Sequence, residues 1–122
     1  MATRFLFPRK ERLKGRDNIR GVFNKKQAFS CPGARLLMNR NGLEYNRIAF
    51  SFPRKYGNAV ERNYSRRLSR EGYRLLRSEL RQGYDMVLLV YSGRDEFTAR
   101  MEQLRALFLK AGLLNPVPDN QK

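Results

Sequence analysis

The 122-residue chain contains no histidine, no tryptophan and a single cysteine, Cys31. Without histidine it lacks the side chain that most often acts as a general base near neutral pH. A lone cysteine forms no internal disulfide, and without a Cys or Cys/His cluster the chain has no zinc-binding motif. These absences oppose hydrolysis by the protein itself, and they favour a reducing, cytoplasmic location.

Acidic residues and long apolar runs are also scarce. The eleven Asp and Glu residues are scattered among basic neighbours, without the dense grouping that a two-metal nuclease needs. The longest apolar run, residues 86–91, is far shorter than a membrane span. A secretory signal and a Walker-type phosphate loop are both missing. We therefore expect no catalytic residues, no metal bound tightly by the protein and no membrane partner.

Positive charge is what the sequence has in excess. The 26 Lys and Arg residues give a formal net charge of +15. Residues 1–26 contain nine basic and two acidic residues, and residues 53–81 contain nine basic and three acidic residues. Residues 82–122 contain five of each, so their charges cancel. Such a charge destabilises a compact chain unless a polyanion neutralises it, and small basic domains commonly bind nucleic acid. Composition alone also allows an anionic membrane surface or an acidic protein, but the apolar stripes are expected to lie in a core, which opposes binding to a membrane surface.

The hydrophobic pattern predicts one domain over residues 1–122, with a basic arm over 1–16 and a loose tail over 115–122. Alternating side chains predict strands over 34–39 and 47–52, and the second strand has one small, polar face that is open to a ligand. The turn signal Asn41-Gly42 separates them. The first helix follows Asp17 as N-cap, and the last starts at Asp95 or Thr98 and ends at Gly112.

Between these elements lie a helix over 58–76 and a buried strand over 84–91. The resulting order is α-β-β-α-β-α, with room for an additional short strand. This order predicts an α+β fold, a small α/β sandwich in which helices pack on a central mixed sheet.

The helix over 58–76 has two predicted faces. Its apolar stripe, with the Tyr64 ring packed against the sheet, is expected to consist of Val60, Tyr64, Leu68, Leu75 and Leu76. Arg62, Arg66 and Arg70 are spaced by four and line up outside this stripe, where guanidinium groups can grip successive phosphates. The alternative is an ordinary solvated helix face, but only Glu61 and Glu71 lie close enough to neutralise it.

The segment from Arg54 to Glu71 resembles the signature of the bacterial ribonuclease P protein family. That signature is a basic pair, Gly-Asn-Ala-Val, Arg-Asn-Arg, a second basic pair and a further Arg. Tyr64 stands where the family usually has a third basic residue. The resemblance extends over roughly residues 9–114 and implies a left-handed β-α-β crossover, a connection that is rare in other folds.

The resemblance also implies a function. A protein of this family assists a catalytic RNA subunit, which uses bound Mg²⁺ to remove the 5′ leader from precursor tRNA. The expected partners are this RNA subunit and precursor tRNA, in a 1:1 ribonucleoprotein that contains one copy of the protein. A ribosomal or other structural RNA-binding protein is the alternative, and the Arg54–Glu71 signature argues against it.

Two sets of site residues follow from the same resemblance. The RNA-binding set is Arg54, Lys55, Arg62, Asn63, Arg66, Arg67 and Arg70. The leader is expected to lie in a cleft between the first helix and the open sheet face, lined by Phe23, Ser51, Leu37 and Ile19. Ile19 and Leu37 stand where the family has aromatic residues. For Phe23 the alternative is core packing beside Ile19 and Val22.

Overall fold

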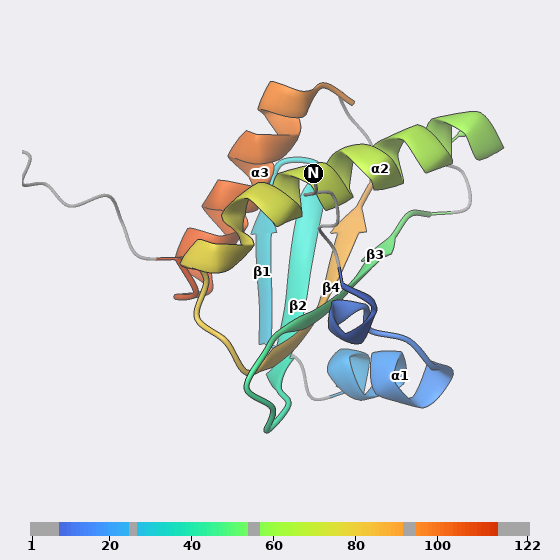
Figure 1. The fold of residues 1–122 in the computed structure, drawn as a ribbon. Coiled ribbons are helices and arrows are strands. Elements are labelled where there is room, and N and C mark those ends of the chain that lie inside the picture. The colour runs from blue at the N-terminus through green and yellow to red at the C-terminus, as the bar shows by residue number, and fades with distance from the viewer. Residues whose placement is uncertain (1–7, 25–26, 54–56, 92–94, 115–122) are drawn as a thin grey trace, which may run out of the picture.

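The computed structural model describes residues 8–24, 27–53, 57–91 and 95–114 (Figure 1). Its helices and strands are α1 (Arg16–Asn24), β1 (Gln27–Cys31), β2 (Ala34–Arg40), β3 (Arg47–Ser51), α2 (Ala59–Leu76), β4 (Tyr84–Val90) and α3 (Phe97–Lys110), with short 3-10 turns η1 (Arg9–Glu11) and η2 (Arg77–Glu79). This order confirms the predicted α+β fold, and β1 is the additional short strand.

The four strands form one mixed sheet in the order β1-β2-β4-β3. β1, β2 and β4 pair antiparallel, whereas β3 pairs parallel with β4. Since parallel neighbours need a crossover connection, α2 links β3 to β4 across one face of the sheet. In Figure 1 the chain rises along β3, crosses the near face in α2 and rises again along β4, to the left of β3. The crossover is therefore left-handed, as the resemblance implies.

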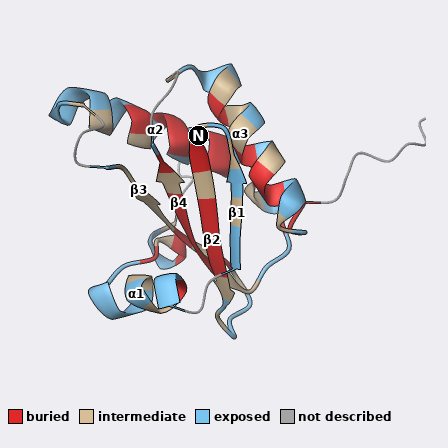
Figure 2. Cartoon of the chain, turned by 180° about the vertical axis from the view of Figure 1, so that it is seen from behind, coloured by how far each residue is buried: buried red, intermediate tan, exposed pale blue. Residues whose placement is uncertain are grey.

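The sheet separates two hydrophobic clusters. Leu36 and Met38 of β2 point toward α2 and α3 and belong to the larger cluster. Leu37, between them in the sequence, points to the other face and packs with Leu13 and Val22 in the smaller cluster. This confirms the predicted alternation. Figure 2 shows the second face from behind, with α1 at its lower end and exposed residues dominating α1 and β1.

The start of α2 follows directly from its sequence. The Asn58 side chain accepts a hydrogen bond from the Glu61 backbone N–H, and the Glu61 carboxylate accepts one from the Asn58 backbone N–H, both at 2.9 Å. This reciprocal capping box satisfies two of the amides that a helix leaves unpaired at its N-terminus. The helix therefore begins where the sequence predicts.

The rotation of α2 about its axis differs from the prediction. Leu68 and Leu76 are buried, but Val60, Tyr64 and Leu75 are 75%, 44% and 43% exposed. The buried face includes instead Ser65, Ser69, Gly72 and Tyr73. At Gly72, α3 comes so close that an added Cβ would lie 2.7 Å from Leu104 Cδ1. The predicted stripe was wrong because a hydrophobic projection counts small residues as polar, whereas they allow close helix packing.

The predicted helix ends are partly correct. α1 begins at Arg16, so Asp17 lies in its first turn and is not the N-cap. α3 is preceded by Glu96 as N-cap, so it starts at neither Asp95 nor Thr98. Gly112 follows the helix with φ +76°, a conformation that glycine adopts without strain, and this confirms the predicted stop.

The described part of the predicted basic arm packs against the domain. The Leu13 N–H donates to the Ile48 carbonyl at 2.9 Å, which attaches this segment to the edge of β3. The buried Glu11 pairs with Arg77 at 3.0 Å. Residues 1–7 of the arm, and the predicted tail over 115–122, lie outside the described residues.

Candidate nucleic-acid interface

The flank of α2 that lies beside β3 brings three of the predicted RNA-binding residues together. Arg62, Asn63 and Arg66 line a shallow hollow of 240 Å³ with Phe52 and Ala59. The Arg66 guanidinium lies 5.2 Å from the centre of the Phe52 ring, within the range of a cation–π contact. Arg66 also donates to Asn63 Oδ1 at 3.4 Å. The ring and the amide orient Arg66 at the rim of the hollow.

Positive charge concentrates one turn further along this flank. Burial lowers the pKa of Arg70, and the positive charges of Arg12 and Arg66 lower it further. The nearby carboxylates are engaged elsewhere, since Glu71 pairs with Arg74 and Glu11 with Arg77. An anion bound among Arg12, Arg66 and Arg70 would relieve their mutual repulsion. We call these three residues the arginine cluster.

Arg12 was not among the predicted site residues. No local sequence signal points to it, because Arg12 comes beside α2 only through the pairing of this segment with β3. Arg67 is exposed on the back of α2, three residues before Arg70 and therefore beside the cluster on the helix surface. Arg54 and Lys55 lie outside the described residues.

The structure brings together two of the residues predicted to line the leader cleft, both on α1. Ile19 and Phe23 line an apolar hollow of 470 Å³ on α1, flanked by Arg16 and Arg20. Phe23 is 39% exposed, so the core position on this helix belongs to Val22 and not to Phe23. On β3, the half-buried Ser51 lies two residues after Ala49 and therefore on the same face of the sheet. Ala49 packs against the smaller hydrophobic cluster, which lies beneath α1.

Leu37 does not line this cleft. Its side chain is only 1% exposed and packs in the core under α1. It therefore offers no surface to a bound base. The alternation of the sequence places Leu37 on the correct face of β2. It does not show that α1 covers Leu37, because that contact depends on how the helix packs on the sheet.

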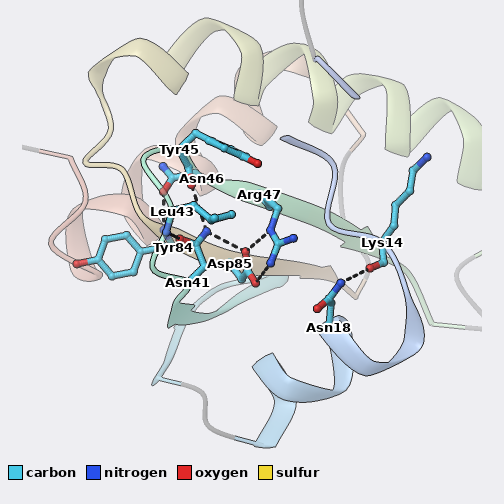
Figure 3. A network of polar contacts seen from close by, with 9 residues as sticks. All are labelled: Lys14, Asn18, Asn41, Leu43, Tyr45, Asn46, Arg47, Tyr84 and Asp85. Carbon is cyan, nitrogen blue, oxygen red and sulfur yellow. Dashed lines mark hydrogen bonds and ion pairs between the residues drawn. The ribbon is translucent and has the colours of Figure 1, made fainter. Parts of the chain in front are cut away.

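A polar network at the foot of the same sheet face was missed by the sequence analysis (Figure 3). Arg47 Nε and one terminal nitrogen donate to the two Asp85 oxygens at 2.8 and 2.7 Å. Asn41 Nδ2 donates to Asp85 Oδ1 at 2.9 Å and ties the loop after β2 to the pair. The hydrogen bond with Asp85 raises the pKa of Arg47. The network fixes the β3–β4 pairing at this end, and the register Arg47↔Asp85 is what brings the two residues together.

The described residues show neither a metal-binding group nor a helix that could span a membrane. Among the residues that the structure describes, no group of three or more His, Cys, Asp or Glu side chains is placed to hold a metal ion. Within the same part of the chain, none of the helices combines the length and the apolar character needed to cross a membrane.

Comparison with known proteins gives consistent matches. The family model described as Ribonuclease P matches residues 7–112. A Dictyoglomus turgidum protein named "Ribonuclease P protein component" is 33% identical over 114 residues, covering 90% of this chain and 96% of that protein. One of the same name from Caldanaerobacter subterraneus is 40% identical over 104 residues, covering 84% and 90%.

Solved structures agree with these matches. The RNase P protein from Thermotoga maritima superposes with a TM-score of 0.73 at 25% identity, covering 82% of this chain and 96% of that one. A Staphylococcus aureus RNase P protein structure gives a TM-score of 0.76 at 20% identity, with 86% and 98% covered, and supports the fold.

Proposed function

This chain belongs to the ribonuclease P protein family, and from that premise we propose that it is the RNA-binding protein subunit of ribonuclease P. In this role it assists a catalytic RNA in removing the 5′ leader from precursor tRNA. The observation that carries the proposal is the pair of separate surfaces, the arginine cluster beside α2 and the apolar hollow on α1. A ribosomal protein is the weaker alternative, because the match to the family spans residues 7–112.

The arginine cluster is suited to phosphates of the RNA subunit. Guanidinium groups form charge-assisted, two-pronged hydrogen bonds with phosphate oxygens. Arg66 and Arg70 are one helical turn apart, about 6 Å, which is close to the spacing of successive phosphates along a strand. The proposed contact therefore uses the side of α2 that faces β3, with Arg12 contributed by the segment attached to that strand.

The hollow on α1 is suited to the single-stranded leader. Phe23 offers a ring on which a base can stack, and Arg16 and Arg20 can neutralise the flanking phosphates. Ser51 lies on the sheet face that α1 partly covers, where its hydroxyl can bond to a base or sugar. Bases of any identity can stack, so this surface would accept leaders of different sequence.

We further propose that the RNA subunit carries out the hydrolysis, with Mg²⁺ that it binds itself, in a complex with one copy of this chain. The absence of histidine from the whole sequence supports this division of work. The protein then contributes positive charge and leader binding, and both raise the affinity of the complex for the precursor.

Replacing Phe23 by alanine tests the leader contact. We expect Phe23→Ala to weaken binding of precursor tRNA about 5- to 140-fold, the equivalent of 1–3 kcal/mol for one stacked base, and to leave mature tRNA unaffected. The measurement is the dissociation constant of each tRNA from the reconstituted complex. Phe97→Ala is the matched control, because Phe97 is equally exposed, at 39%, but lies on α3 across the sheet. Equal losses for precursor and mature tRNA would contradict the assignment.

A further inference from the structure

One aromatic side chain of α2, Tyr64, is exposed and is not part of the hydrophobic core. Tyr64 is 44% exposed, and Val60, one turn before it, is 75% exposed. The aromatic residue that packs α2 into the core is Tyr73, whose ring lies 6.5 Å from Phe50 and 6.3 Å from Phe108. Tyr64 thus presents its ring outward from a helix that another tyrosine already anchors.

The surroundings of Tyr64 are strongly basic. α2 carries five arginines and two glutamates, and both carboxylates are already engaged. Glu61 closes the capping box with Asn58, and Glu71 pairs with Arg74. Arg67 lies three residues after Tyr64, so the two side chains are neighbours on the helix surface. A ring beside an exposed guanidinium in a positive field fits a polyanion that also has flat aromatic groups, such as the RNA of the proposed complex.

The position of Tyr64 separates it from the arginine cluster. At about 100° per residue, Tyr64 points about 160° away from Arg66, with the back of the helix between them. A partner that contacts both flanks must therefore wrap around the exposed side of α2. Exposed Asn63 and Arg67 lie on that side and continue the polar surface from one flank to the other.

We propose that Tyr64 is a stacking platform for an unpaired base of the RNA subunit, with Arg67 binding an adjacent phosphate. The inference rests on the proposed function and deepens it. Stacking on tyrosine tolerates any base and does not depend on counterion release. Loss of the ring should therefore leave the salt dependence of binding unchanged, whereas loss of an arginine should reduce it.

A fluorescence experiment reports stacking directly. The chain has no tryptophan, so Tyr64→Trp introduces a single reporter. We expect a bacterial ribonuclease P RNA to quench this tryptophan and to protect it from acrylamide. Leu109→Trp is the control, because Leu109 is similarly exposed, at 43%, but lies near the end of α3. Equal quenching and equal acrylamide access at the two positions would overturn the proposal.

Affinity gives an independent test. Tyr64→Ala should weaken binding of that RNA roughly 5- to 140-fold with an unchanged slope of log K against log salt, and Tyr64→Phe should bind like the unaltered chain. Arg67→Ala should lower the slope by about one unit. The melting temperature of Tyr64→Ala should stay that of the unaltered chain, since the ring is outside the core.

The outcomes separate this inference from the function on which it rests. If the unaltered chain binds the RNA and Tyr64→Ala binds equally well, Tyr64 is no platform and the proposed function stands. If Tyr64→Ala lowers the salt slope as Arg67→Ala does, the loss is electrostatic and stacking is overturned. If the unaltered chain fails to bind any bacterial ribonuclease P RNA, the proposed function is overturned and this inference with it.

Discussion

Arg100→Leu is expected to lower the free energy of unfolding by about 3 kcal/mol, because it removes the donor at the centre of a buried polar cluster. Arg100 is only 1% exposed. Its guanidinium donates to Ser69 Oγ at 2.6 Å, to Asp95 Oδ1 at 2.7 Å and to Ser65 Oγ at 3.2 Å. Without it the serine hydroxyls and the Asp95 carboxylate lose a charged partner where water replaces it poorly.

The measurement is equilibrium unfolding in urea, followed by circular dichroism. Arg105→Leu is the matched control, since Arg105 is exposed on the same helix and its loss should change stability by less than about 0.5 kcal/mol. A second variant that combines Arg100→Leu with Ser65→Ala and Ser69→Ala should recover the part of the loss that comes from the two serine hydroxyls, because apolar side chains of similar total volume then replace Arg100 and both serines. Equal stability of Arg100→Leu and Arg105→Leu would show that the cluster does not hold α2 against α3.

Replacing Arg66 and Arg70 together by alanine is expected to lower the slope of log K against log salt for RNA binding by about two units, one for each phosphate contact. The loss of affinity should therefore be greatest at low salt and shrink as salt rises. The measurement is a titration of a bacterial ribonuclease P RNA at several salt concentrations.

The control for this double variant removes the same net charge elsewhere. Arg40 lies over the Tyr84 ring at the lower end of β2, and Arg105 is exposed on α3, so both are away from the arginine cluster. Arg40→Ala with Arg105→Ala should leave the slope nearly unchanged. Equal slopes for the two double variants would mean that total charge, and not the position of Arg66 and Arg70, controls binding.

The strands and the start of α2 could be predicted because their signals are local. Alternation in β2 is a property of consecutive residues, and the capping box needs only Asn58 and Glu61, three residues apart. Strand β1 gave a weaker signal, because this edge strand buries little and only Phe29 and Cys31 pack against the core.

The rotation of α2 could not be predicted, because it depends on a partner 31 to 35 residues away. Arg100 turns Ser65 and Ser69 inward, and this rotation exposes Tyr64. The same limit applies to the site. The motif identified Arg62, Asn63, Arg66 and Arg70, but Arg12 joins them only through the pairing of Leu13 with β3. Leu37 was placed on the correct face, yet α1 covers it.

The most direct test of the central claim is reconstitution with a bacterial ribonuclease P RNA at low Mg²⁺. We expect the purified chain to raise the rate of leader removal from precursor tRNA, with cleavage at the mature 5′ end, and to cleave nothing in the absence of that RNA. The variant lacking Arg66 and Arg70 should require more protein for the same rate. An unchanged rate at every Mg²⁺ concentration, or specific cleavage by the chain free of RNA, would contradict the account.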